Sequence, residues 1–259
     1  MTFYDDLFFN KDTVGTICEY KLELLIIKEI IAKLEEAVCS KQPFDKESEE
    51  HTYFEFAEAI VSNAKAAYDN MVIGHIDVTN MLNRKIIEQY VSLKILINNP
   101  GKQLCDYWKV HSFYKGVHTY SAKYEDRLIE MLGEMYEHLN IEEDFYKNRK
   151  GKAPIEKNYA WIYPLTKDHP SFKRLCELAE EPNYEDFSFM SEFVHGTNML
   201  FINRKSVFGS SILNTLSILV FFIRQFTMLY LGYLDGEEIL EKIEEFGELC
   251  ISSIPDNLD

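Results

Sequence analysis

The sequence predicts an all-α protein: a multi-helix bundle of about eight to ten helices with no substantial sheet. Apolar residues recur at three- and four-residue spacings along almost every long segment, which is the periodicity of an amphipathic helix. No segment alternates apolar and polar residues as a half-buried strand would. The chain is 46% hydrophobic and 14% aromatic, which is enough to bury a sizeable core.

The first half of the chain carries long helical patterns. Residues 16–39 predict the first helix, since Leu24, Ile27 and Ile31 share one face. Further helices are predicted over residues 49–73, 78–97, 104–117 and 121–139. The helix over 78–97 ends at the motif NNPG, because Pro100 disfavours continuation and Gly101 allows a turn.

The second half begins with an irregular, basic and proline-containing connection over residues 147–170. Its prolines restrict the residues before them and interrupt any helical period. Short helices are predicted over 171–180 and 184–195, and long ones over 207–232 and 237–250. No connection is long enough to force a division, so we expect a single helical domain over residues 1–259.

The charge balance is acidic, with 43 Asp and Glu against 27 Lys and Arg and a net charge of −16. Such a surface repels phosphate at long range. We therefore expect neither general nucleic-acid binding nor attachment to an anionic membrane. A local phosphate contact stays open at one basic loop, beside the interpretation that the loop is only solvated. That loop carries Lys147, Arg149, Lys150 and Lys152.

Cysteine usage and the apolar segments predict a cytoplasmic location. The five cysteines are scattered and form no C-x-x-C pair. This spacing is typical of reduced thiols in a cytosol and not of a disulfide framework or a zinc site. The N-terminus lacks the basic start and apolar run of a signal peptide. Arg224 and Gln225 interrupt the longest apolar stretch, residues 218–234, which predicts a core helix. No Walker loop, G-x-G-x-x-G or H-E-x-x-H is present, so we expect neither a cofactor nor a metal.

The predicted helix over 78–97 carries a charged pair on an otherwise apolar stripe. Arg84, Glu88, Val91 and Ile95 fall within a sector of about 60° on a helical wheel. Arg84 and Glu88 are at i and i+4, so their side chains can meet. Two interpretations are open: a surface ion pair worth a few tenths of a kcal/mol, or a partly buried pair that needs further partners.

The predicted helix over 184–195 carries a polar stripe that ends in a histidine. Tyr184, Ser188, Ser191 and His195 fall within a sector of about 60°. The stripe fits either the rim of a binding site or a set of hydrogen bonds that bridges two helices, and Asn198 is added as a binding candidate. His195 also suits a plain helix end, since Gly196 fits the C′ position and an imidazole favours the negative helix end.

Two stretches resemble a known family. They are NMLNRKIIEQYVSLKIL and the later segment from NYAWIYPLTKDHPSF to MSEFVHGTN. Together they are similar to a bacterial all-helical domain-of-unknown-function family of the 5677 type, over roughly residues 70–230. The resemblance implies that Arg84, Glu88, Ser191 and His195 are recurrent polar positions of a family with no settled activity. The chain departs from it after Trp161, where the family has a small residue and glycine.

That family is itself distantly similar to HEPN-like helical domains of prokaryotic toxins and phage defence. Those RNases place an arginine and a histidine about four to six residues apart on one helix. Here no arginine lies within six residues before His195. Any catalytic pair must therefore come from separate helices.

Three hypotheses follow from these observations. The first is an interaction or sensing module in phage defence or stress response, with a protein partner or self-association as a homodimer. In it Arg84, Glu88 and His195 form a structural polar cluster. The alternative is a metal-independent RNase or nucleotide-transfer enzyme. Its catalytic candidates are His195 as general acid/base, Arg84 on the phosphate and Glu88. Its binding candidates are Tyr184, Ser188, Ser191 and Asn198. The third is a ligand site in the core, suggested by 18 Phe and 16 Tyr.

Overall fold

The computed structural model describes residue 17 and residues 19–101, 103–117, 125–147, 153–167, 171–181 and 205–252. Over these residues the chain forms helices and turns, with no strand. The predicted all-α fold class is therefore confirmed.

The chain divides into two compact units. Unit 1 comprises Met1–Tyr90 and Asn183–Asp259, and unit 2 comprises Val91–Pro182. One predicted domain over residues 1–259 stays a prediction, because two compact units can belong to one domain or to two.

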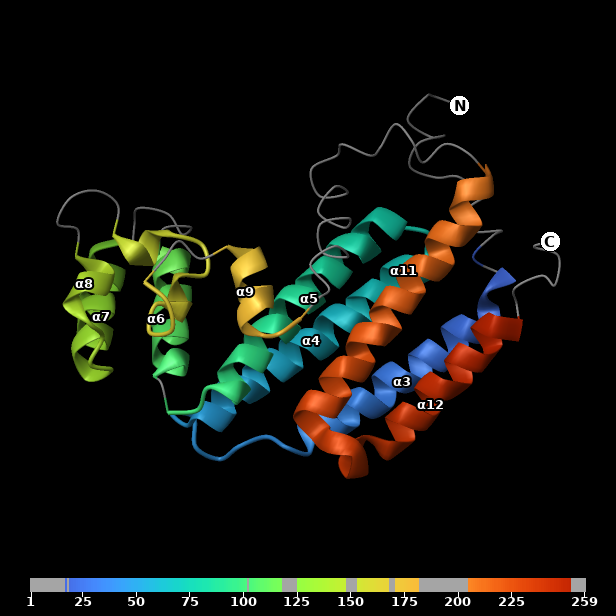
Figure 1. Cartoon of the computed structure of the whole chain (residues 1–259), viewed down its shortest axis with the longest axis horizontal. Helices are drawn as coiled ribbons and strands as arrows, with labels where there is room; N and C mark the ends of the chain where they lie inside the picture. Colours follow the sequence, from blue (N-terminus) through green and yellow to red (C-terminus); the bar gives the residue numbers. More distant parts are fainter. Residues whose placement is uncertain are drawn as a thin grey trace. The chain divides into compact units, whose positions relative to one another are not determined.

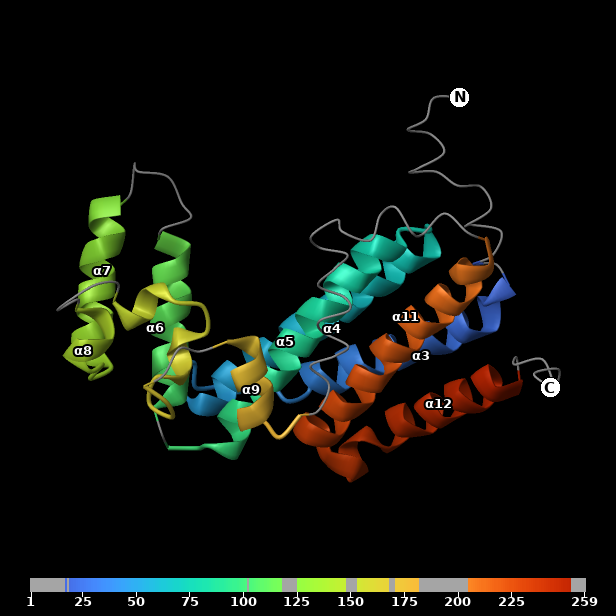
Figure 2. The same ribbon diagram turned by 45° about the horizontal axis from the view of Figure 1, so that its top comes forward.

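Unit 1 is a bundle of long helices that run along a common direction (Figures 1 and 2). Its members are α3 (Lys21–Cys39), α4 (Glu49–Val72), the first part of α5 (Ile76–Asn98), α11 (Lys205–Phe226) and α12 (Gly232–Ser252). The predicted seam of α3 is buried, including Leu24, Ile27 and Ile31. α4 begins after Ser48, whose side chain accepts a hydrogen bond of 3.1 Å from the His51 amide.

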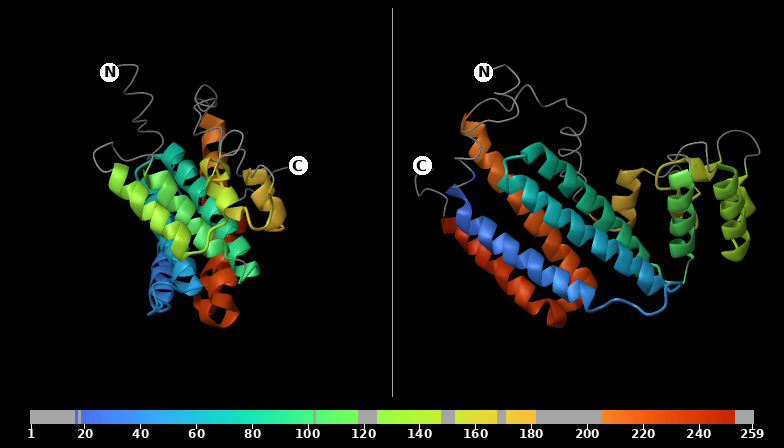
Figure 3. Two further views of the ribbon diagram at one scale, coloured as in Figure 1. Left: turned by 90° about the vertical axis from the view of Figure 1, so that its left-hand side faces the viewer. Right: turned by 180° about the vertical axis from the view of Figure 1, so that it is seen from behind.

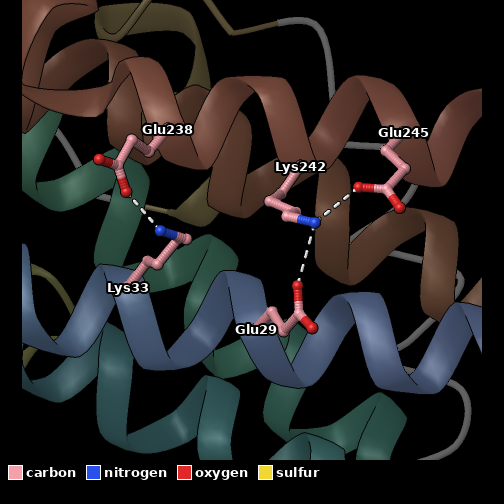
Figure 4. A network of polar contacts seen from close by, with 5 residues as sticks. All are labelled: Glu29, Lys33, Glu238, Lys242 and Glu245. Carbon is pink, nitrogen blue, oxygen red and sulfur yellow. Dashed lines mark hydrogen bonds and ion pairs between the residues drawn. The ribbon is translucent and has the colours of Figure 1, made fainter.

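The α3 and α12 helices lie side by side (Figure 3). Lysines at the edge of this contact reach glutamates of the facing helix (Figure 4). Lys33 of α3 pairs with Glu238 of α12. Lys242 of α12 bridges Glu29 of α3, at 3.1 Å, and Glu245, at 2.8 Å. Ion pairs therefore flank the apolar seam without entering it.

A π-helical turn, η4 (Thr227–Leu231), joins α11 to α12. The predicted helix over 207–232 thus ends its α-helical part at Phe226. The buried Thr227 hydroxyl donates a hydrogen bond of 2.8 Å to the Ile223 carbonyl. A Cβ placed on Gly236 would lie 2.5 Å from Thr227 Cγ2, so the turn requires a glycine there.

Unit 2 is built from shorter helices. They are α6 (Leu104–Val117), α7 (Glu125–His138), α8 (Glu143–Tyr146), η2 (Pro154–Glu156), η3 (Ala160–Ile162) and α9 (Phe172–Leu178). The Tyr107 ring packs edge-on against Phe145 at 4.8 Å between centroids. Within the predicted connection over 147–170, residues 153–167 contain two single 3₁₀ turns, which bury Ile155 and Trp161.

Two side chains of α6 hold this segment by its backbone. His111 Nε2 lies 2.9 Å from the Lys157 carbonyl, and Lys115 Nζ donates to the Glu156 carbonyl at 2.8 Å. Since a carbonyl only accepts, the ring proton of His111 sits on Nε2. Burial lowers the pKa of His111 to about 4, so the imidazole is neutral at pH 7.

Candidate functional site

The best-defined polar group of unit 1 lies along α5 and begins with the predicted charged pair. Arg84 Nη2 lies 3.8 Å from Glu88 Oε1, and the two side chains are 22% and 18% exposed. Lys85 Nζ approaches the other carboxylate oxygen of Glu88 at 3.6 Å. Of the two interpretations left open by the sequence, this geometry favours the partly buried pair with a further partner.

The same helix also carries two buried asparagines that contact α11. Asn83 Nδ2 donates a hydrogen bond of 3.0 Å to the Thr215 carbonyl. Thr215 Oγ1 in turn donates to Asn80 Oδ1 at 3.1 Å. All three residues are buried, with Asn80 and Asn83 only 1% exposed. The centre of the α5–α11 contact is therefore polar, in the middle of an apolar core.

Each of these two amides uses one of its two polar atoms and leaves the other without a partner among the described residues. Asn80 Nδ2 and Asn83 Oδ1 have no hydrogen-bond partner among the described residues. Each such atom costs about 1–3 kcal/mol when it is buried. An amide does not titrate near neutral pH, so this pair can orient a group but cannot act as a general acid or base.

Neither Asn80 nor Asn83 was predicted from the sequence as a residue of the site. The helix begins at Ile76, which places both asparagines inside it. A signal was available: Asn80 and Asn83 share a wheel sector with Ile87 and Val91, both buried. Two amides that interrupt the apolar stripe of a helix predict a buried polar contact.

A second polar link joins α5 to α4. Asn63 Nδ2 donates to Gln89 Oε1 at 2.8 Å, and the Thr79 hydroxyl lies 3.2 Å from the Ala67 carbonyl. These contacts hold α5 between α4 and α11. The rotation of α5 that presents Arg84 and Glu88 is thus set by hydrogen bonds on both sides.

The remaining candidates lie outside the described residues. They are His195, Tyr184, Ser188, Ser191 and Asn198. Of the proposed catalytic residues the structure therefore describes Arg84 and Glu88, which it brings together. A catalytic pairing of Arg84 with His195 stays a prediction.

The described residues contain no cluster suited to a metal ion and one helical stretch with the length and composition of a membrane span. No group of three or more His, Cys, Asp or Glu there is arranged to hold a metal ion. One helical stretch, Ile212–Cys250, is long and apolar enough to cross a membrane by length and composition. Just over half of its most apolar part is buried inside the fold, as the core helix of a soluble protein also would be.

No protein-family model, curated protein or solved structure matches the chain.

Proposed function

We propose that this protein is a helical interaction or sensing module in which Arg84 and Glu88 serve the structure. The contact between Arg84 and Glu88 carries this proposal. An arginine that binds phosphate attracts it by its positive charge. The Glu88 carboxylate, 3.8 Å from the Arg84 guanidinium, weakens that attraction. Lys85 is drawn to the same carboxylate. The carboxylate of Glu88 thus offsets one of the two positive charges, and the three side chains together keep a net charge of +1.

The surroundings support the same proposal. Next to Arg84 on α5 lie the amides Asn80 and Asn83, which do not titrate and which bond to α11. Their contacts are those of a polar core that fixes one packing arrangement. The chain's net charge of −16 also opposes a nucleic-acid substrate.

The setting we propose follows the family resemblance: a bacterial cytoplasm, with phage defence or stress response as the process. A protein partner, or a second copy of the chain, would then be the ligand. The enzyme alternative keeps Arg84 and His195 as its catalytic pair and makes different predictions for the same variants.

Two sets of measurements separate these functions. Purified chain is incubated with fluorescent RNA and with nucleotides, beside an Arg84→Gln/His195→Gln variant as the background. The proposal expects no turnover above that background. Turnover by the natural sequence that the double variant abolishes, at unchanged melting temperature, would refute it.

The second measurement tests the structural role directly. Glu88→Gln removes the carboxylate that contacts Arg84, whereas Arg84→Gln/Glu88→Gln removes both charges. If the pair serves the structure, the double variant unfolds at a higher denaturant concentration than Glu88→Gln alone, because it no longer keeps a partly buried guanidinium that has lost the Glu88 carboxylate. Equal stability of the two variants would argue against a structural pair.

A further inference from the structure

One end of unit 1 exposes a group of large apolar side chains, here named the hairpin-end surface. It consists of Phe44, Met228, Tyr233 and Leu234. Phe44 is fully exposed, and Leu234, Tyr233 and Met228 are 85%, 61% and 43% exposed. Scattered single exposed apolar residues need no explanation, but a group of this kind at one place marks an interaction site.

An ion pair brings the two contributing segments together. Lys41 Nζ, just after α3, lies 2.7 Å from Asp235 Oδ2 at the start of α12. Leu234 precedes that aspartate, and Phe44 follows Lys41 by three residues, a span of at most about 11 Å. The end of α3 and the α11–α12 turn lie side by side in opposite views (Figures 1 and 3).

The fold keeps α12's part of this surface pointing outward. α12 buries the face that carries Ile239, Ile243 and Phe246. Leu234 lies on the opposite side of the helical wheel from that face. The close approach of Gly236 to Thr227 fixes the rotation of the helix start. Turning Leu234 inward would therefore expose the buried face of the same helix.

The surface has a strongly acidic border. Segments 41–50 and 233–241 together contain eight Asp and Glu but only two Lys. On the inner edge of α12, Asp235 and Glu238 already pair with lysines of the α3 segment. Glu237 and Glu241 lie on the outer face, and no lysine or arginine among the described residues forms an ion pair with either.

The acidic border of the hairpin-end surface favours one kind of binding partner. A second copy would bring the same acidic border against this one, and phosphate or an anionic lipid would also be repelled. A basic segment suits both features, because lysines or arginines would meet Glu237 and Glu241 while apolar residues cover Leu234 and Phe44. Lys33 of α3 and Lys41 just after it, which pair with Glu238 and Asp235, are an internal example of this pairing.

We propose that the hairpin-end surface docks a basic amphipathic helix of another protein, with apolar anchors flanked by lysine or arginine. This inference rests on the proposed interaction function and names the chemistry of the partner. It makes the α11–α12 turn, and not the Arg84 group, the contact region.

The probe is a synthetic leucine–lysine peptide of about five helical turns with helical periodicity, titrated into the full chain by fluorescence anisotropy. The comparison peptides are a scrambled leucine–lysine peptide and a leucine–glutamate peptide. We expect the periodic basic peptide to bind, and Phe44→Ser/Leu234→Ser to weaken its binding by about tenfold or more. Leu22→Ser, which changes another exposed leucine of unit 1, is the matched control and should bind within about twofold of the natural sequence.

The charge is tested with a second matched pair. Glu237→Lys should weaken binding, whereas Glu248→Lys, three turns farther along the same exposed face of α12, should not. Equal effects of the two lysine variants, or equal binding of the scrambled peptide, would reduce the interaction to general charge attraction and overturn the proposal. So would a dimer that Leu234→Ser converts to a monomer, or binding to phosphatidylcholine vesicles that the same variant abolishes.

Failure of this inference and failure of the proposed function give different results. Turnover of RNA together with peptide binding at Phe44 and Leu234 would refute the proposed function and support the surface. Absence of turnover together with peptide binding that ignores both residues would refute the surface alone.

Discussion

Two helix contacts of unit 1 use polar side chains in opposite ways. Where α3 meets α12, the ion pairs of Lys33 and Lys242 lie at the edge, with side chains 30–77% exposed (Figure 4). Where α5 meets α11, Asn80, Asn83 and Thr215 lie in the middle and are almost fully buried. The α3–α12 contact has many charged groups, which stay largely hydrated. The α5–α11 contact has few polar atoms, and these are shielded from solvent.

The difference between the two contacts indicates which polar groups contribute most to stability. Exposed ion pairs are weakened by water and salt and by the cost of ordering long side chains. A buried amide or hydroxyl that loses its partner instead bears its full desolvation cost. We therefore expect changes in buried polar contacts to exceed changes in the α3–α12 ion pairs, even though the latter are more numerous.

The largest effect should come from the buried histidine of unit 2. Its folded pKa of about 4 lies below the ordinary value of 6.5, so the unfolded chain binds the proton first as the pH falls. The stability from neutral His111 is complete above pH 6.5 and is lost as the pH falls toward 4, by about 3 kcal/mol.

Denaturant unfolding at several pH values checks this loss. Both tryptophans, Trp108 and Trp161, belong to unit 2, so their fluorescence follows the unit that contains His111. His111→Gln keeps an N–H donor for the Lys157 carbonyl and does not titrate. If the variant loses as much stability as the natural sequence between pH 6.5 and 4.5, the buried imidazole is not the cause.

The next largest effect concerns the turn that supports both α11 and α12. Gly236→Ala places a Cβ 2.5 Å from Thr227 Cγ2, and Thr227 is held by its bond to Ile223. We expect a loss of about 1–3 kcal/mol from this overpacking. Gly247→Ala on the same helix meets nothing within 4 Å and should stabilise the helix by about 0.5–1 kcal/mol.

A second substitution identifies the cause of that loss. Thr227→Ser removes the obstructing methyl group and keeps the hydroxyl, so it should recover most of the stability lost in Gly236→Ala. Thermal unfolding followed by circular dichroism gives the melting temperatures of the natural sequence, the two single variants and the double variant. A double variant no more stable than Gly236→Ala would show that the obstruction lies elsewhere.

Periodicity predicted the long helices because their apolar faces are long enough to leave a pattern. The segment over 49–73 became α4, Glu49–Val72, with Ser48 as its cap. The short α8 and the two 3₁₀ turns were not predicted, since three or four residues carry no period. The break at Thr227 was also missed, because a π turn depends on how Thr227 packs against Gly236 and not on local propensity.

The site was less predictable than the fold for a related reason. The pair Arg84 and Glu88 follows from spacing alone, and the contact between them is confirmed. The bond from Asn83 to Thr215 joins residues 132 positions apart, so no local pattern contains it. A sequence can mark Asn80 and Asn83 as polar residues in an apolar stripe, but only the packing of α11 identifies their partner.

The buried contact of α5 and α11 itself gives an intermediate effect. Thr215→Val removes the only described hydrogen bond of the Asn80 amide and should cost about 1–2 kcal/mol. Asn80→Leu/Thr215→Val removes the stranded amide as well and should be more stable than Thr215→Val alone. Denaturant unfolding of the two single variants and the double variant measures this coupling. Strictly additive losses would mean that the two side chains do not interact.

The smallest effect should come from the edge of the α3–α12 contact. Lys242→Ala removes both ion pairs of that lysine, yet its partners Glu29 and Glu245 remain in contact with water. At low salt the melting temperature should fall only slightly more than for Lys28→Ala, an exposed lysine of α3. At about 1 M salt, where the screening length is about 3 Å, the two variants should become indistinguishable. A loss in Lys242→Ala that persists at high salt would mean that its methylene stem packs on the seam, and that the edge of this contact resembles its interior more than its charges suggest.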